Sequence, residues 1–296
     1  MKSITLNLDK SVPYHLTMYN KQLFLIGGKE DKGDKPLLLE EFCNRFKPAD
    51  GPLILITGAS RIPLEVGEIY TRIFTRLGVS DIIHLPLTRR SDCNLPENVN
   101  IMERASAVFI TGGNQVKLAG ILGGTPFFQI LKQRVNEGLL YGGTSAGASI
   151  ASGLMIAGGR GGYNPRRNLV KLTGGLALIR GCIIDQHFRE RNRLFRLASA
   201  VSSNPEFIGL GIDEDTALII TDDRYCSVVG SNSVTVLNGN GITHTGYTEG
   251  KAQDAIPIFG LNLNVVTPGY GYDLIERSPI LKKDKKSKSP NVLETA

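Results

Sequence analysis

Ser145 is the residue whose setting points most clearly to chemistry, because it lies in Gly-Thr-Ser-Ala-Gly at residues 143–147. A Gly-x-Ser-x-Gly pattern is weak alone in a chain with 34 glycines. Here an apolar run at residues 139–143 leads into the motif, and small residues follow at 146–152. A sharp strand-to-helix turn needs such small neighbours and holds its serine in strained backbone above a sheet. We therefore predict that Ser145 is a nucleophile and not only part of a turn.

A serine nucleophile needs a general base, and only four histidines are available. His15 precedes the first predicted strand, His84 lies inside a strand, and His244 follows a glycine-rich hairpin. His187 ends an apolar strand at residues 182–188, so it lies at the edge of the sheet where ligands bind. A lone histidine usually has a structural role, but elimination favours His187 as the base.

The third member of a triad is an acid that orients the imidazole. Residues 209–216 offer Asp213, Glu214 and Asp215 at another strand end, and spacing alone does not choose among them. The chain order is serine, histidine, acid, whereas α/β-hydrolases have serine, acid, histidine. The sequence therefore argues against the α/β-hydrolase fold.

An arginine-rich segment directly follows the predicted base, with four arginines at residues 189–196. On a helix, Arg189, Arg193 and Arg196 would share one face and Arg191 would lie opposite. One interpretation is a solvated amphipathic helix. The other is a binding site for a substrate with carboxylates, which planar guanidinium groups grip in a bidentate manner.

Apolar runs alternate with helical patterns through the first half of the chain. Strands are predicted at residues 22–28, 52–58, 81–86, 107–113 and 138–143. Helices are predicted at residues 37–46, 64–77, 97–105 and 127–137. This alternation predicts an α/β fold with a mostly parallel sheet covered by helices on both faces. Its carboxyl edge would carry the glycine turns and the candidate site.

Short strands with turn signals follow after about residue 215, at residues 216–221, 225–229 and 233–237. They predict an antiparallel extension of the same sheet near the C-terminus. We expect an N-terminal arm at residues 1–20, a single hydrolase domain at 21–280 and a basic, disordered tail at 281–296.

Composition excludes several classes of protein. The formal net charge is +6, and five lysines of the tail carry much of it without interleaved aromatics or arginines, so no nucleic-acid partner is expected. Four dispersed cysteines give no Cys-x-x-Cys pair, and no metal or other cofactor is expected. Because no apolar run has the length of a signal peptide or a membrane span, we expect a cytoplasmic protein without a membrane partner.

Four segments together resemble the cyanophycinases, which belong to the serine peptidase family that also contains aspartyl dipeptidase. The segments are Thr-Gly-Gly-Asn-Gln at 111–115, Gly-Thr-Ser-Ala-Gly-Ala at 143–148, Asp-Gln-His-Phe at 185–188 and Gly-Ile-Asp-Glu-Asp-Thr-Ala at 211–217. The resemblance covers about residues 20–275. Its most specific part is residues 185–188 with the spaced arginines, which separates cyanophycinases from the shorter dipeptidase.

The resemblance implies a class I glutamine-amidotransferase-like fold, a homodimer, and hydrolysis of cyanophycin to β-aspartyl-arginine dipeptides. Cyanophycin is a poly-aspartate backbone with an arginine on each β-carboxyl. Residue by residue, the resemblance makes Ser145 the nucleophile, His187 the base and Glu214 the acid. The implied substrate-binding residues are Gln115, Asp185, Gln186, Arg191, Arg193 and Arg196.

The strand ends also predict an oxyanion hole, formed by the backbone N–H of Ala146 and one from Gly112 or Gly113, with Gly113 preferred. Two alternatives stay open. One is an aspartyl or isoaspartyl dipeptidase on the same fold, which would cleave dipeptides but not the polymer. The other is a catalytically idle binding protein of amidotransferase-like fold, in which Ser145 would not react with a serine-directed reagent.

Overall fold

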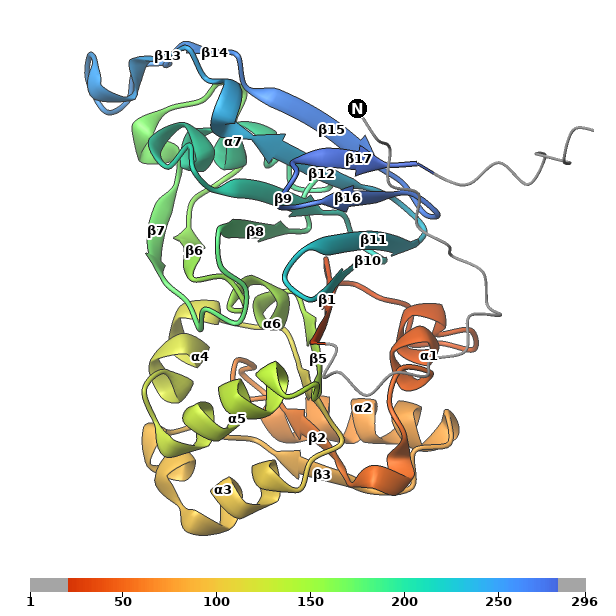
Figure 1. Ribbon diagram of the computed structural model, residues 1–296. Helices are drawn as coiled ribbons and strands as arrows, with labels where there is room; N and C mark the ends of the chain where they lie inside the picture. The colour runs from red at the N-terminus through yellow and green to blue at the C-terminus, as the bar shows by residue number, and fades with distance from the viewer. Residues whose placement is uncertain (1–20, 282–296) are drawn as a thin grey trace, which may run out of the picture.

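A computed structural model describes residues 21–281 (Figure 1). The predicted arm at residues 1–20 and residues 282–296 of the predicted tail lie outside the described residues. No helix within residues 21–281 is long and apolar enough to cross a membrane.

The centre of the fold is a nine-stranded sheet in the order β17-β16-β11-β10-β1-β5-β4-β2-β3. Its strands are β1 (Gln22–Ile26), β2 (Leu53–Ile56), β3 (Ile82–Leu85), β4 (Ala107–Ile110), β5 (Leu140–Thr144), β10 (Thr216–Thr221), β11 (Tyr225–Gly230), β16 (Gly271–Asp273) and β17 (Ser278–Ile280). Strands β1 to β5 pair in parallel, and β1 pairs antiparallel with β10 on its other side. Every residue of β2, β4 and β5 is buried, as expected for strands covered on both faces.

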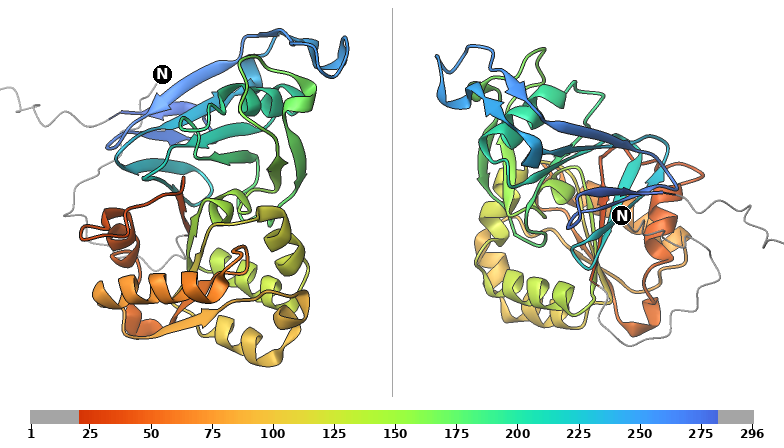
Figure 2. Two further views of the ribbon diagram at one scale, coloured as in Figure 1. Left: turned by 180° about the vertical axis from the view of Figure 1, so that it is seen from behind. Right: turned by 45° about the horizontal axis from the view of Figure 1, so that its top comes forward.

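Helices cover both faces of the parallel half of this sheet (Figures 1 and 2). They are α1 (Leu37–Cys43), α2 (Pro63–Arg76), α3 (Pro96–Glu103), α4 (Gln115–Leu122) and α5 (Pro126–Asn136). Phe24 of β1 packs with α1 and α2 in one apolar cluster, whereas its neighbour Leu25 packs with α3, α4 and α5 in another. Alternate residues of a strand point to opposite faces, so one strand serves both cores.

A second sheet of four strands lies beside the central one, in the order β15-β12-β9-β8. Its strands are β8 (Cys182–Gln186), β9 (Ile208–Ile212), β12 (Val234–Asn238) and β15 (Asn262–Val266). Strands β8 and β9 are parallel, so their carboxyl ends lie together. Helix α7 (Leu194–Ser203) packs on this sheet through a third apolar cluster.

The remaining elements are short. Two-stranded pairs are formed by β6 (Leu154–Gly158) with β7 (Lys171–Gly174) and by β13 (His244–Thr245) with β14 (Ile258–Phe259). The remaining helix, α6 (Ala146–Ser149), is a single turn. Turns of 3₁₀ helix occur at Pro48–Asp50, Arg90–Asn94, Arg167–Leu169, Gly239–Gly241 and Gly246–Thr248.

The predicted α/β class, with a mostly parallel core and an antiparallel extension, is confirmed, but the extension contains β16 and β17 in place of one of the strands predicted for it. Strands β10 and β11 continue the central sheet as predicted. The strand predicted at residues 233–237 does not, because β12 pairs with β9 and β15 in the second sheet. After β11 the chain bonds to the 213–215 segment, since Ser231 N–H donates to Asp215 O (2.9 Å) and Asp213 N–H donates to Ser233 O (3.2 Å). These bonds lead β12 onto β9.

Candidate active site

Ser145 lies at the sharp turn between β5 and α6, as the sequence predicts. Its backbone angles, φ 53° and ψ −108°, are strained for a residue with a side chain. Its N–H donates to Ile26 O of the neighbouring strand (2.9 Å). A Cβ on Gly147 would overlap Ile110 O, and a Cβ on Gly143 would overlap Gly147 O. The glycines therefore allow α6 to approach the sheet closely enough for this turn.

His187 follows β8 and also has a positive φ, at 48°. Its N–H donates to Gly27 O (2.8 Å), which ties the end of β8 to the end of β1. The imidazole lies against the Cα of Gly28, where any side chain would overlap the ring. In this position His187 Nε2 is 2.9 Å from Ser145 Oγ. The second sheet thus brings the candidate base to the candidate nucleophile of the first.

Glu214 is the acid that contacts His187 among the three candidates. Its Oε1 is 2.7 Å from His187 Nδ1, and its Oε2 is 3.0 Å from Lys29 Nζ. The Asp213 carboxylate is fully buried and accepts from the hydroxyl of Ser233 (2.8 Å). The Asp215 carboxylate accepts from the N–H of Asp31 (3.3 Å). Ser145, His187 and Glu214 therefore form a continuous chain of contacts.

The surroundings of His187 and Glu214 favour a neutral base beside an ionised acid. Burial lowers the pKa of His187, and the charges of Arg191 and Arg193 lower it further against the opposing effect of Glu214. Desolvation raises the pKa of Glu214, but hydrogen bonds from Lys29 and His187 outweigh it, so that the pKa lies below its ordinary value. Near neutral pH, His187 is free to accept a proton and Glu214 is charged.

We expect the acidic limb of kcat/KM against pH to be centred below about 6.5, the ordinary pKa of histidine. Hydrolysis requires neutral His187, so the rate rises with pH through the lowered pKa. Arg191→Ala removes a positive charge that opposes protonation, and the limb should move to higher pH. Rates measured from pH 4 to pH 8 test this. Arg189→Ala is the control, and a limb that moves equally in both variants would contradict the electrostatic account.

Three backbone amides at or near the nucleophile turn have no hydrogen-bond acceptor among the described residues. Within residues 21–281, the N–H groups of Gly112, Gly113 and Ala146 donate to no other backbone or side-chain group. A Cβ built on Gly112 would lie 3.3 Å from Ser145 Cβ, so the turn after β4 touches the elbow. Ala146 is the first residue of α6, where amides have no partner within the helix.

The arginine segment is not the helix that its periodicity suggested. Residues 188–193 form turns, and α7 begins only at Leu194. Asn192 has a φ of 49°, and Arg193 N–H donates to Phe188 O (3.0 Å), which closes the turn. The face that Arg189, Arg193 and Arg196 would share on a continuous helix therefore does not form, because Arg189 lies in the turn before α7.

Two of these arginines are buried in an ion-pair network around Asp185. Arg193 is 8% exposed and Arg196 is 3% exposed. Asp185 accepts from Arg193 Nη1 (3.2 Å) and from Arg196 Nε (2.9 Å). Arg193 Nη1 also donates to Gln186 Oε1 (2.8 Å). Burial lowers the pKa of Arg193 to about 10, so it stays charged at neutral pH. In this structure the network fixes the side chain of Gln186 beside His187.

Arg191 differs from the buried pair. It is exposed, and its side chain forms no hydrogen bond or ion pair within residues 21–281. The loop after β6 packs on this turn, because a Cβ on Gly161 would overlap Arg191 O. Gln115 Nε2, at the start of α4, donates to Ile156 O of β6 (3.0 Å). The β6–β7 pair and its loop therefore connect Gln115 with the arginine turn.

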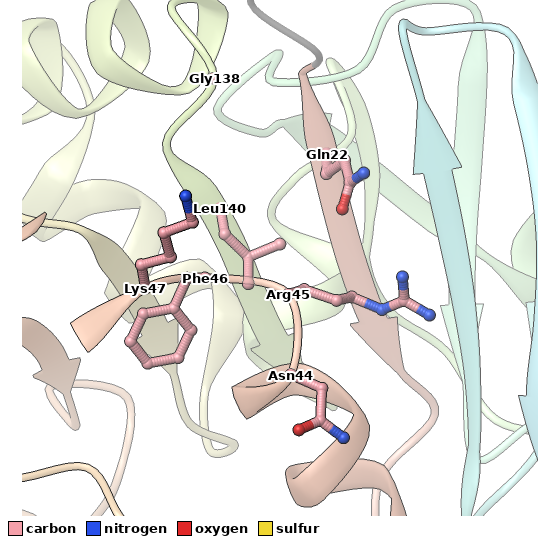
Figure 3. A pocket seen from close by; sticks show the side chains of 7 residues that line it. All are labelled: Gln22, Asn44, Arg45, Phe46, Lys47, Gly138 and Leu140. Carbon is pink, nitrogen blue, oxygen red and sulfur yellow. The ribbon is translucent and has the colours of Figure 1, made fainter. Parts of the chain in front are cut away.

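A separate cavity of about 330 Å³ lies where β1 and β5 begin, at the other end of these strands from Ser145 (Figure 3). It is lined by Gln22, Asn44, Arg45, Phe46, Lys47, Gly138 and Leu140. Gln22 and Leu140 begin β1 and β5, whereas Ser145 follows the end of β5. Ligands of parallel sheets bind at the carboxyl ends of the strands, so we do not assign this cavity to the candidate site.

Lys29 and Glu30 are site residues that the sequence analysis missed. Lys29 contacts Glu214, and Glu30 accepts from the hydroxyl of Thr144 (2.6 Å), the residue before the nucleophile. Their signal was present, because they directly follow the glycines at the end of the first predicted strand.

Comparison with known proteins agrees with this geometry. The family model described as peptidase family S51 matches residues 23–228. The chain belongs to peptidase family S51. The predicted resemblance and the predicted enzyme class, a serine-type peptidase, are thereby confirmed.

Relatives in this family carry the name cyanophycinase. The protein of Geminocystis herdmanii (strain PCC 6308) is 37% identical over 259 residues, which cover 87% of this chain and 95% of the relative. The protein of Nostoc sp. (strain PCC 7120 / SAG 25.82 / UTEX 2576) is 38% identical over 257 residues, or 86% of each chain. Both alignments extend over most of both proteins.

Solved structures support the fold. A peptidase from an acI-B1 Actinobacterium superimposes with a TM-score of 0.63 at 23% identity and covers 85% of this chain and 96% of its own. A putative peptidase E protein from Listeria monocytogenes EGD-e gives a TM-score of 0.50 at 22% identity, covering 72% and 98%. At these identities the likeness concerns the fold alone.

Proposed function

We propose that this peptidase hydrolyses cyanophycin to β-aspartyl-arginine dipeptides through an acyl-enzyme on Ser145. The observation that carries the proposal is the contact chain from Ser145 Oγ through His187 to Glu214. Its place at the carboxyl edge of the central sheet, in a chain with cyanophycinases among its relatives, supports the choice of substrate.

In the first half of the reaction, Ser145 Oγ attacks a backbone carbonyl carbon of the polymer and its proton passes to His187 Nε2. The carbonyl oxygen becomes an oxyanion, which we expect the N–H groups of Ala146 and of Gly113 or Gly112 to stabilise. The C–N bond then breaks. The proton on Nε2 moves to the leaving amine, and an ester on Ser145 remains.

In the second half, water attacks the ester carbon while His187 takes its proton, and the returned proton restores the Ser145 hydroxyl as the new carboxylate leaves. Glu214 accepts a hydrogen bond from Nδ1–H throughout, so that in the resting enzyme Nε2 is the unprotonated nitrogen directed at Ser145. The ion pair with Lys29 holds the second oxygen of Glu214 and thereby fixes the plane of its carboxylate.

Substrate recognition divides between two layers in this proposal. Each unit of the polymer carries a free arginine α-carboxylate, and we expect the exposed guanidinium of Arg191, whose charge acts on His187, to bind it. Gln115 and Gln186 complete the predicted contact surface. The predicted substrate residues Asp185, Arg193 and Arg196 support that surface from beneath, because their charges satisfy one another.

Arg191→Ala should lower kcat/KM for cyanophycin by about ten- to a hundredfold, the loss of one charge-assisted contact. Arg191→Lys should recover little, because a point charge cannot reproduce a bidentate grip. Steady-state kinetics measure both. Arg189→Ala, a change in the same turn, is the matched control and should stay near wild type. Full activity of Arg191→Ala would remove this residue from recognition.

The proposed function is tested by incubating the protein with cyanophycin and with polyaspartate at equal residue concentration and identifying the products by mass spectrometry. We expect β-aspartyl-arginine from cyanophycin and little release from polyaspartate. Equal rates would leave a peptidase without specificity for the β-linked arginine. Cleavage of β-aspartyl-arginine dipeptide without cleavage of the polymer would favour the dipeptidase alternative.

We also propose a homodimer and a cytoplasmic location. The homodimer follows from the family resemblance and is tested by light scattering of the purified chain. The location is supported by the cysteines, since Cys43, Cys93, Cys182 and Cys226 are all free, as in a reducing compartment.

A further inference from the structure

Glu30 is a buried carboxylate that the catalytic chain does not use. It lies in the loop after β1, and only 3% of it is exposed. Its Oε2 accepts from Thr144 Oγ1 (2.6 Å), while its Oε1 accepts from the hydroxyl of Tyr70 and pairs with Lys32 Nζ (3.0 Å). A charge in a protein interior is costly unless it is paired and hydrogen-bonded. Each oxygen of Glu30 meets that condition.

One of these hydrogen bonds lies directly beside the candidate nucleophile. Thr144 directly precedes Ser145, whose backbone is strained. Such strain persists only where the surroundings fix the backbone. Two polar contacts from β1 and its loop do so here: Ile26 O accepts from Ser145 N–H, and Glu30 holds the side chain of Thr144.

The loop after β1 also contacts His187 and Glu214. Gly27 O accepts from the N–H of His187, and Lys29 pairs with Glu214. The loop after β1 is therefore a common support for three groups that come from three different strands. Glu30 is the residue of this loop that contacts the nucleophile turn, through one hydrogen bond from the hydroxyl of Thr144.

We propose that Glu30 is a positioning residue that holds the nucleophile turn through Thr144 and so sets the alignment of Ser145 Oγ with His187. It contacts no reacting atom. The inference rests on the proposed role of Ser145. A misplacement of about 1 Å at a reacting group can cost about a hundredfold in rate, so a loosened turn should act on kcat. Substrate binding uses other residues and should change little.

The test compares Thr144→Val with Thr144→Ser. Valine keeps the shape of threonine but removes the hydroxyl that Glu30 accepts from, whereas serine keeps the hydroxyl. We expect Thr144→Val to lower kcat on cyanophycin by about tenfold or more with KM within about twofold, and Thr144→Ser to restore most of kcat. Rates are expressed per serine reactive towards a fluorophosphonate, which removes any loss of folded enzyme from the comparison.

Glu30→Gln and the double variant Glu30→Gln/Thr144→Val extend the test. If both residues act through one contact, the double variant should be no slower than the slower single variant. Thr57→Val is the control, because Thr57 is also buried at a strand end but bonds to His84 Nε2 (2.8 Å). It should change the melting temperature without changing kcat per reactive serine.

Wild-type kcat per reactive serine in both Thr144→Val and Glu30→Gln would overturn the inference. The same holds if the loss in Thr144→Val is not restored by serine. In either case an inactive Ser145→Ala variant would leave the proposed function standing. An active Ser145→Ala variant would instead reject the nucleophile itself, so the two failures are distinguishable.

Discussion

Ser145→Ala should abolish hydrolysis of cyanophycin while the protein remains folded. Loss of a serine nucleophile lowers kcat by about 10⁴-fold or more, because the covalent route is gone. The turn should survive, since alanine fits the space of serine and the bond from the residue 145 N–H to Ile26 O does not involve the side chain. Product release from cyanophycin, followed by mass spectrometry over hours, measures the loss.

The folded state of this variant is its necessary control. Its melting temperature and circular dichroism should match those of the wild type, because among the residues described the removed hydroxyl hydrogen-bonds only to His187. Near-wild-type turnover by a preparation free of wild-type enzyme would reject Ser145 as the nucleophile.

Glu214→Gln should lower kcat by about 10²- to 10⁴-fold, which is the second large effect we expect. The amide cannot carry the negative charge that stabilises protonated His187. Its NH₂ group can also replace the Nδ1 proton as donor, which would leave Nε2 protonated and unable to accept from Ser145. Steady-state kinetics on cyanophycin with a matched thermal melt measure this effect.

Asp215→Asn is the matched control for Glu214→Gln. Asp215 is the next residue but bonds to the loop at Asp31 and not to the imidazole. Its variant should keep kcat within about threefold, because the half-buried Asp215 carboxylate bonds to Asp31 and Ser231 and not to the candidate triad. Asp213→Asn should act on stability, since its buried carboxylate holds Ser233. A larger kcat loss in Asp215→Asn than in Glu214→Gln would transfer the orienting role.

Local patterns were sufficient for most of the first half of the fold. The apolar runs at residues 52–58 and 107–113 contain β2 and β4, and the helical spacing at residues 64–77 matches α2 within one residue at each end. The nucleophile turn could also be predicted, because close backbone contacts at Gly143 and Gly147 leave no room for a side chain.

Strand pairing was harder to predict from the sequence, because the residue pattern of a strand does not say which other strand it pairs with. The apolar pattern of β12 is the same whether the strand extends the central sheet or pairs with β9. The choice depends on bonds of Asp213 and Asp215 to the chain after β11, which are contacts between distant segments. The same limit applies to His187 and Glu214, whose meeting requires the parallel pairing of β8 with β9.

The arginine segment shows why periodicity alone misled. Helical spacing of charges is also compatible with a turn, and a φ of 49° at Asn192 ends any helix there. The buried partner of Arg193 and Arg196 is Asp185, which lies two residues before the candidate base His187 and not on the same helix. Lys29 and Glu30 were missed for a related reason, because their roles depend on which residues face the loop after β1.

The most direct test of the account is covalent modification by a serine-directed fluorophosphonate, followed by peptide mapping and activity measurement. The account predicts one adduct, on the peptide that contains Ser145, with loss of cyanophycin hydrolysis in proportion to labelling and protection by excess cyanophycin. Full inactivation with Ser145 unmodified, or full activity with Ser145 completely modified, would contradict it.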